Sequence, residues 1–327
     1  MKVLVTGGAG FIGSYVCKKL VERGDEVIVY DSFVNYISPY LSNYPIYLRK
    51  RLEELKDGIE IVRGDIRHKS FLHRTLKKHQ PDSIIHLAAL PISTISNIYS
   101  EDAFEINLNG TINVLEVIRE FDLIQRFVYA SSSMVYGNFE RTPADENHPT
   151  NPIEVYGATK LSGEILTRAY SKQYGIEYTI IRPSSVYGPT DANRRVSQIF
   201  VERALAGEVI YLDNGGKDKL DFTYVKDVAK GFVLALKSEK AVNETFNITY
   251  GESKSLKEFV SALQTLIPNI RMKDKKEEFI RPKRGTLDIR KAKKLLGYKP
   301  DYPLERGLKE YVEFVKKCGV SRPCSIP

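Results

Sequence analysis

Along its first 182 residues the chain alternates short apolar runs with longer stretches whose apolar positions recur at helical spacing. The apolar runs predict strands at residues 2–6, 26–30, 59–63, 83–88, 126–130 and 177–182. The stretches between them predict helices at residues 11–23, 70–78, 103–121 and 156–174. Buried strands that alternate with helices are typical of a parallel sheet with helices on both faces. The pattern therefore predicts an α/β fold with a doubly wound parallel sheet of the Rossmann type.

The alternation ends near residue 182, where loops containing glycine and proline interrupt it. Helices are predicted near residues 196–206 and 256–266, with short strands between them. Residues 220–250 contain a further apolar helical stretch, which we expect to return to the first domain of residues 1–182. Residues 183–219 and 251–327 are expected to form a smaller, mixed α/β lobe over the C-terminal edge of the sheet. Ligands of open α/β sheets bind at that edge, so the cleft between the two parts is the expected site.

A glycine-rich turn joins the first predicted strand to the first predicted helix. Gly7, Gly10 and Gly13 have the spacing Gly-x-x-Gly-x-x-Gly, and Phe11 and Ile12 lie between the last two. The turn needs backbone torsions that favour glycine. A side chain at one of these glycines would block a bound pyrophosphate, and a side chain at another would hold the helix away from the strand. Glycines at this spacing between a strand and a helix predict a dinucleotide-binding site.

An acidic residue, Asp31, closes the second predicted strand. A carboxylate there can accept hydrogen bonds from the adenosine ribose and would repel a 2′-phosphate. Ser32 and Phe33 follow it, so no arginine is adjacent to receive that phosphate. We therefore expect NAD rather than NADP, and the first domain to be the NAD-binding domain. Asp65 and Ile66, after the third strand, are expected to flank the adenine.

Tyr156 and Lys160 begin a predicted helix and lie on one of its faces, because they are four residues apart. A free phenol ionises near pH 10, which is too high for a base at neutral pH. A nearby ammonium lowers that pKa, and the same lysine can hydrogen-bond the ribose of the nicotinamide. The serines at 131–133 end the preceding strand, where a hydroxyl can bind the same substrate oxygen as the tyrosine. This arrangement predicts hydride chemistry driven by the Tyr156/Lys160 pair.

Together these motifs resemble the extended short-chain dehydrogenases/reductases, in particular their nucleotide-sugar epimerase group, the UDP-glucose 4-epimerase-like enzymes. The matching segments are residues 6–13, 31, 64–66, 86–89, 107–113, 131–137, 156–160, 182–183, 186–189 and 221–228. The resemblance implies that Tyr156 is the catalytic acid/base, that Lys160 assists it and that Ser132 orients the substrate. It also implies that Leu87, Ala88 and Ala89 line the cofactor site, and that His86 is structural.

Some positions depart from the patterns of that family. Related dehydratases and decarboxylases carry acidic residues where this chain has Ser133 and Met134, and a methionine cannot transfer a proton, so dehydration is disfavoured. Ser185 stands where many C4-epimerases have an asparagine that contacts the substrate diphosphate, and Leu220 stands where they have a phosphate-binding arginine. A later arginine is retained at Arg281. The expected substrate contacts are Ser132, Ser133, Ser185 and Arg281.

Composition and charge narrow the class of protein. Hydrophobic residues make up 42% and charged residues 28%, as in ordinary globular proteins, and neither a signal peptide nor a membrane span is predicted. The three cysteines (Cys17, Cys318 and Cys324) suit a reducing cytoplasm. The net charge of +8 is spread along the chain without the aromatic interleaving of nucleic-acid modules, so we expect no nucleic-acid partner and no membrane partner. The histidines have no metal-ligand spacing, and we expect no metal.

The leading hypothesis is the NAD-dependent epimerisation of a nucleotide-linked sugar at C4, through a transient keto intermediate. A net reductase or dehydrogenase of a nucleotide-linked keto sugar would use the same residues but exchange its cofactor, NAD or NADP, at every turnover. A non-catalytic dinucleotide-binding protein is a third reading, which the intact set of Tyr156, Lys160 and Ser132 disfavours. The nucleotide, the sugar and the carbon that is inverted stay open at this point. The resemblance further implies a homodimer formed through the helices at 103–121 and 156–174.

Overall fold

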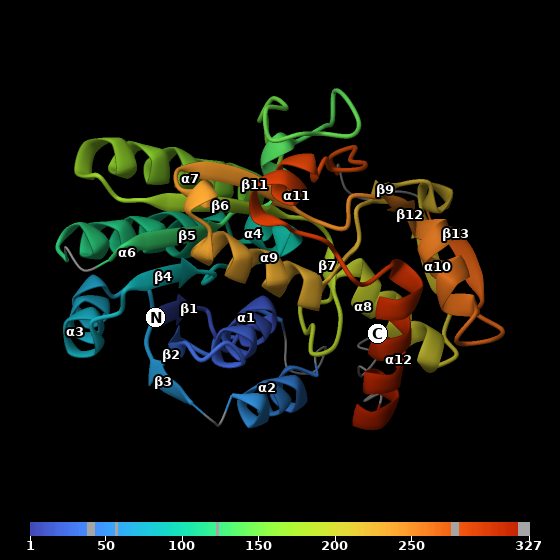
Figure 1. Cartoon of the computed structure of the whole chain (residues 1–327). Helices are drawn as coiled ribbons and strands as arrows, with labels where there is room; N and C mark the ends of the chain where they lie inside the picture. Colours follow the sequence, from blue (N-terminus) through green and yellow to red (C-terminus); the bar gives the residue numbers. More distant parts are fainter. Residues whose placement is uncertain (38–42, 56–57, 122–123, 276–280, 320–327) are drawn as a thin grey trace.

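The computed structural model describes residues 1–37, 43–55, 58–121, 124–275 and 281–319. Its centre is a seven-stranded sheet with the order β11-β6-β5-β4-β1-β2-β3, in which every neighbouring pair is parallel (Figure 1). The strands are β1 (Lys2–Thr6), β2 (Glu26–Asp31), β3 (Ile59–Arg63), β4 (Ser83–His86), β5 (Arg126–Ala130), β6 (Tyr178–Pro183) and β11 (Glu244–Ile248). The order reverses between β1 and β4, which places a ligand crevice at the carboxyl ends of these strands.

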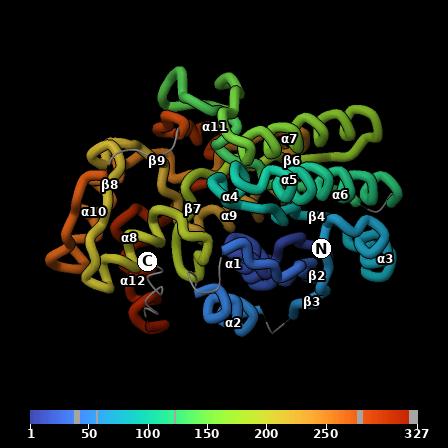
Figure 2. The backbone as a smooth tube through the Cα atoms, turned by 180° about the vertical axis from the view of Figure 1, so that it is seen from behind, coloured from blue at the N-terminus to red at the C-terminus, as the bar shows by residue number. Residues whose placement is uncertain are grey.

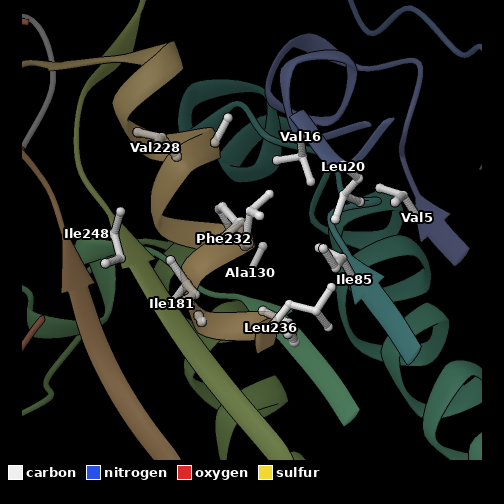
Figure 3. Close-up of a cluster of buried hydrophobic side chains, with 14 of the residues drawn as sticks. Val5, Val16, Leu20, Ile85, Ala130, Ile181, Val228, Phe232, Leu236 and Ile248 are labelled. Carbon is white, nitrogen blue, oxygen red and sulfur yellow. The ribbon is translucent and has the colours of Figure 1, made fainter. Parts of the chain in front are cut away.

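One face of the sheet is covered by α1 (Phe11–Val21) and α9 (Val225–Lys237). Leu20 of α1 and Phe232 of α9 are fully buried in one apolar core with Ile85 of β4 (Figure 3). Helix α9 and strand β11 both lie within residues 220–250, so this later part of the chain packs on the large sheet and extends it.

The opposite face is covered by α3 (Lys69–His79), α6 (Gly110–Arg119) and α7 (Val155–Tyr174). Leu72 of α3 and Leu115 of α6 are fully buried in a second apolar core against the strands. Figure 2 shows α6 and α7 side by side on this face. Helices on both faces of a parallel sheet confirm the predicted doubly wound Rossmann-type architecture.

The burial of the strands explains why their sequences are continuous apolar runs. Val3, Leu4 and Val5 of β1 alternate between the two faces, and all three are fully buried because helices cover both. The edge strand β3 differs, since Glu60 and Arg63 are exposed. Charged side chains on an edge strand disfavour pairing with another chain.

The smaller lobe combines helices with three two-stranded sheets, which confirms the predicted mixed α/β composition. Its elements are α8 (Val196–Leu205), α10 (Leu256–Gln264), α12 (Leu304–Cys318), and the strand pairs β7 (Val186–Tyr187) with β10 (Thr223–Tyr224), β8 (Ile210–Asp213) with β13 (Met272–Lys275) and β9 (Lys219–Leu220) with β12 (Lys254–Ser255). Phe200, Phe259 and Tyr311 lie at the centre of its own apolar core. Within the described residues, no helix is long and apolar enough to cross a membrane.

Short helical segments complete the chain. They are α2 (Tyr44–Glu54), α4 (Ser93–Ile98), α5 (Ser100–Ala103), η2 (Phe104–Asn109), η3 (Ser133–Tyr136), η4 (Asn214–Gly216), η5 (Glu239–Ala241) and α11 (Arg290–Leu296). The sequence pattern did not predict α2. It also predicts strand β4 to continue to residue 88, whereas the strand ends at His86.

The long helix predicted over residues 103–121 is present as a continuous helical run over residues 100–119, but part of it is π-helical rather than α-helical. A π-helical segment, η2, separates α5 from α6, and it holds Asn107. The Asn107 side chain accepts a hydrogen bond from the Leu90 backbone N–H and donates to the Leu90 carbonyl and to Thr159 of α7. Because these partners are distant in sequence, the apolar periodicity gave no sign of the wider turn. The π segment places Asn107 where it joins the loop after β4 to α7.

Candidate active site

Every residue predicted to bind the cofactor lines one cavity at the carboxyl ends of the central strands. These residues are Gly7, Gly10, Phe11, Ile12, Gly13, Asp31, Asp65, Ile66, Leu87, Ala88, Ala89, Tyr156 and Lys160. They come from segments that are far apart in sequence and that the parallel topology brings to one edge of the sheet. The cavity is therefore the candidate site for the dinucleotide.

The glycine turn has the geometry that a pyrophosphate requires. Gly7 has a φ of 71°, and a Cβ on it would lie 2.7 Å from the Ala88 backbone nitrogen. A Cβ on Gly13 would lie 2.1 Å from the Gly7 carbonyl oxygen, so a side chain there would force α1 away from the turn. Helix α1 begins with Gly10 as its N-cap residue and carries no acidic side chain in its first turn. These features fit an anion at the N-terminus of α1.

Asp31 is tied to this turn by two backbone groups. Its carboxylate accepts hydrogen bonds from the Ala9 N–H at 3.0 Å and the Phe33 N–H at 2.7 Å. Burial raises the pKa of Asp31, and these hydrogen bonds and the positive charge of Arg51 counteract the rise. The residue therefore shapes the turn and at the same time presents a carboxylate to the cavity.

Lys160 is almost completely buried below the cavity, one helical turn from Tyr156 on α7. Its ammonium donates a hydrogen bond to the Ala130 carbonyl at 2.8 Å and lies over the Tyr129 ring, 5.3 Å from its centroid. Burial lowers the pKa of Lys160 to about 7. A buried lysine with this pKa can gain or lose a proton near neutral pH.

Burial raises the pKa of the Tyr156 phenol, while the positive charge of Arg195 and a hydrogen bond with Ser132 lower it. Ser132 is itself buried, and its hydroxyl also accepts a hydrogen bond from the Met134 N–H at 3.2 Å. Of the three residues predicted to be catalytic, Tyr156 and Lys160 line the cavity, and Ser132 reaches it only through its hydrogen bond with Tyr156.

The residues predicted to contact the substrate are more scattered. Ser133 is buried and donates a hydrogen bond to the Ser184 hydroxyl at 3.1 Å. Ser185 has a φ of 40°, and its carbonyl accepts a hydrogen bond from the Thr223 N–H. Arg281 is partly exposed and lies 3.6 Å from Asp213. None of these three residues, nor Ser132, is among the side chains that line the cofactor cavity, so their contact with substrate stays a prediction.

A different late arginine, Arg284, is half-buried in this region. The guanidinium Nε of Arg284 has no hydrogen-bond partner among the described residues. Burial lowers the pKa of Arg284 to about 10, while the charges of Glu154 and Asp218 counteract the shift. Glu154 directly precedes α7, so Arg284 lies near the start of the helix that carries Tyr156. The sequence pattern had favoured Arg281, rather than Arg284, as the late arginine that contacts the substrate.

The cavity also holds two arginines that the sequence analysis missed, Arg51 and Arg195. One signal for Arg51 was present, because Tyr47, Arg51 and Leu55 follow one another at helical spacing and all three are buried. Because burying a charge is costly, a cationic side chain on the buried face of a helix indicates that a nearby protein group or a bound ligand pairs with it. For Arg195 we find no comparable signal in the sequence.

His86 has a structural environment, as the resemblance implies. Its ring lies between the Thr6 hydroxyl at 2.6 Å and the Thr111 hydroxyl at 3.1 Å. Burial lowers its pKa to about 3, so the ring is neutral at physiological pH. Over the part of the chain that the structure describes, no group of three or more His, Cys, Asp or Glu side chains is arranged to hold a metal ion.

Comparisons of the sequence and of the structure with known proteins find the same kind of relative, the epimerases. The family described as NAD dependent epimerase/dehydratase matches residues 3–249. UDP-glucuronate 4-epimerase 4 of Arabidopsis thaliana is 32% identical over 95% of this chain and 74% of its own length. A UDP-glucose 4-epimerase of Thermotoga maritima, solved with UDP-glucose, is 31% identical with a TM-score of 0.87, over 97% of this chain and 99% of its own. A UDP-glucuronic acid 4-epimerase of Bacillus cereus, solved with UDP-glucuronic acid and NAD, is 29% identical with a TM-score of 0.89, also over 97% and 99%.

Proposed function

Since the chain belongs to the NAD dependent epimerase/dehydratase family, we propose that it inverts C4 of a UDP-linked sugar with NAD as a retained cofactor. The observation that carries this proposal is that Tyr156 and Lys160 line the same cavity as the dinucleotide motif, while Ser132 hydrogen-bonds Tyr156. The enzymes reported above, which act on UDP-glucose or UDP-glucuronate, support the nucleotide and the carbon.

In the proposed reaction Tyr156 takes the proton of the C4 hydroxyl while Ser132 hydrogen-bonds the same oxygen. A bound NAD would supply the hydride chemistry, with hydride transfer from C4 and back to the opposite face of the 4-keto sugar. Lys160 lies one helical turn from Tyr156 on α7 and can donate a hydrogen bond to the nicotinamide ribose, whereas the charge that lowers the Tyr156 pKa is that of Arg195. When the sugar has turned over, Tyr156 gives the proton back to the C4 oxygen, so the reaction has no net redox change.

A panel of UDP-sugars tests the proposal. The purified enzyme is incubated without added cofactor with UDP-glucose, UDP-galactose, UDP-glucuronate and UDP-galacturonate, and the products are separated by chromatography. We expect one C4 pair to interconvert, and denaturation of the protein to release NAD. Turnover that needs added NAD(P)H and consumes it would instead favour the reductase.

Asp31 is proposed to select NAD over NADP. Asp31→Ala combined with Ser32→Arg should improve the use of NADP, because it removes a carboxylate and adds a guanidinium near the 2′-phosphate. Since Asp31 also binds the Ala9 and Phe33 N–H groups, we expect the affinity for NAD to fall in the same variant. The measurement is the dissociation constant of each dinucleotide for both proteins. A wild-type protein that binds NADP more tightly than NAD would contradict the assignment.

Dehydration between C5 and C6 should be negligible. It needs a base for the C5 proton and an acid for the departing hydroxyl, but the segment after Ser132 offers only the buried Ser133 and the half-buried Met134. General acid–base assistance contributes roughly 10²–10⁴-fold in rate, and its loss should remove this branch of the chemistry. Mass spectrometry of UDP-, dTDP-, GDP- and CDP-hexoses incubated with the enzyme is therefore expected to show no loss of water. A 4-keto-6-deoxy product at a rate comparable with epimerisation would refute this prediction.

Arg195 should govern the pH dependence of the reaction. Its charge lowers the pKa of Tyr156, so in Arg195→Gln the phenolate loses stabilisation and the phenol ionises only at higher pH. We expect the rise of kcat/KM with pH to move to higher pH, and activity at pH 7 to fall. Arg74→Gln, which removes a guanidinium from α3, is the matched control and should keep the wild-type profile. An unchanged profile in Arg195→Gln would contradict the role of Arg195.

We also propose a cytoplasmic homodimer. Large apolar side chains are exposed on the neighbouring segments α4, η2 and α7: Ile98 is 66% exposed, Phe104 46% and Ile165 57%. An exposed apolar patch of this kind suits a second copy of the chain packed across a twofold axis. Light scattering should give twice the 37.2 kDa chain mass, and Phe104→Glu with Ile165→Glu should give monomers. A wild-type monomer would contradict the dimer.

A further inference from the structure

Arg51 is a buried cation that connects three parts of the chain. It lies on α2 and is only 4% exposed. One guanidinium nitrogen donates to the Ala9 carbonyl in the glycine turn at 3.2 Å, and another donates to the Thr190 carbonyl in the loop before α8. Arg51 therefore links α2, the dinucleotide turn and the smaller lobe at the wall of the cofactor cavity.

The polar groups around Arg51 are incompletely satisfied. Arg51 Nε, the Thr190 hydroxyl and Asp191 Oδ2 are all buried without a hydrogen-bond partner among the described residues. Thr190 and Asp191 are adjacent in sequence, and Asp191 exerts the strongest attractive charge effect on Arg51. Several unpartnered polar atoms in one buried region are unusual, because almost all such groups in folded proteins have partners.

The positive charge of Arg51 also has no counter-ion in direct contact. Its two hydrogen bonds are to neutral carbonyls, and no ion pair of Arg51 is found among the described residues. The nearby carboxylates have other partners: Asp31 accepts from backbone N–H groups, and Asp191 pairs with Arg195 at 2.8 Å. Burial lowers the pKa of Arg51, which shows the energetic cost of a guanidinium without a close anion.

The position of Arg51 and its positive charge together indicate which anion it would bind. Arg51 donates a hydrogen bond to the carbonyl of Ala9 in the glycine turn, and this turn leads directly into the N-terminus of α1, where an anion is favoured. Arg51 also lines that cavity. We propose that Arg51 binds the pyrophosphate of the dinucleotide and so joins α2 and the loop at 189–195 to the cofactor. The inference rests on the proposed function in that it takes NAD as the ligand.

Binding of three ligands to cofactor-free protein tests this role. NAD and ADP-ribose contain the pyrophosphate, whereas adenosine has only the base and ribose. In Arg51→Gln the dissociation constants of NAD and ADP-ribose, measured by calorimetry, should rise roughly 10- to 100-fold, because hydrogen bonds to charged groups are lost. The dissociation constant of adenosine should stay unchanged. Arg49→Gln is the matched control, since Arg49 is an exposed residue on the same helix paired with Glu53.

The outcomes separate this inference from the proposed function. Equal weakening of all three ligands, or no weakening of any, would overturn the role of Arg51 while leaving the epimerase intact. A wild-type protein that binds ADP-ribose through Arg51 but converts no UDP-sugar would overturn only the proposed function. If Arg51→Gln does not fold, Arg51→Lys keeps the charge but not the planar guanidinium. Arg51→Lys should raise the dissociation constants of NAD and ADP-ribose, but not that of adenosine, by a smaller factor than expected for Arg51→Gln. If Arg51→Lys binds NAD and ADP-ribose as tightly as the wild-type protein does, the inference is refuted.

Discussion

Tyr156→Phe is expected to lower kcat by roughly 10²–10⁴-fold while the protein stays folded and still binds NAD. The substitution keeps the aromatic ring at the end of the cavity but removes the only group proposed to take the C4 hydroxyl proton. Ser132 cannot replace it, because a serine hydroxyl is far less acidic than a phenol. The measurement is kcat for the UDP-sugar that the panel identifies, together with the dissociation constant of NAD.

Tyr170→Phe is the matched control for that experiment. Tyr170 lies on the same helix, and its hydroxyl donates a hydrogen bond to Glu116, away from the cavity. We expect this variant to keep wild-type kcat. Near-normal turnover in Tyr156→Phe would show that another residue is the acid/base.

Arg182→Leu should have the largest effect on stability. Arg182 forms two hydrogen bonds with Glu164, at 2.8 and 2.7 Å, and both side chains are almost completely buried below the catalytic residues. Removing the arginine leaves the Glu164 carboxylate buried without its main partner, which should cost about 3–5 kcal/mol of the free energy of unfolding. Urea denaturation at pH 7 measures the loss. Arg168→Leu removes a partly exposed arginine from the same carboxylate and should cost less than about 1 kcal/mol.

The pH dependence of that difference has a definite sign. Burial raises the pKa of Glu164, but the hydrogen bond and charge of Arg182 outweigh it and hold the pKa below its usual value. The stabilisation is therefore present above the pKa of the unfolded chain and is lost as pH falls through the lower pKa of the folded state. The stability gap between wild type and Arg182→Leu should therefore narrow as pH falls below about 4.3, the ordinary pKa of a glutamate. A gap that is constant over this range would mean that the pair does not act through ionisation.

Much of the fold followed from local sequence because the sheet is covered on both faces. Continuous apolar runs such as Val3–Val5 have no other stable place than the interior of such a sheet. The need for Gly13 was equally local, since a side chain there would meet Gly7 and Gly8 within the same turn, whereas a side chain on Gly7 would meet Ala88 in the loop after β4. The Tyr156/Lys160 pair needed only helical spacing to be placed on one face.

What the sequence did not reveal depends on contacts between distant segments. The π segment at Asn107 is stabilised by Leu90 and Thr159, which no periodicity within residues 103–121 can indicate. Arg195 reaches the cavity only because the loop before α8 folds back over the turn, where its guanidinium lies over the Phe11 ring. Substrate contacts are the least predictable of all, because they lie in the smaller lobe, outside the local motifs of the parallel sheet.

In the proposed reaction a hydride leaves C4 for a retained NAD and returns to the opposite face of the same carbon. Deuterium at C4 of the UDP-sugar that the enzyme converts follows this hydride, when the labelled sugar is incubated in ordinary water with an excess of free unlabelled NAD. We expect the inverted product to keep the deuterium at C4 and the free dinucleotide to gain none. Deuterium lost to water, or found in the free dinucleotide, would contradict this reaction.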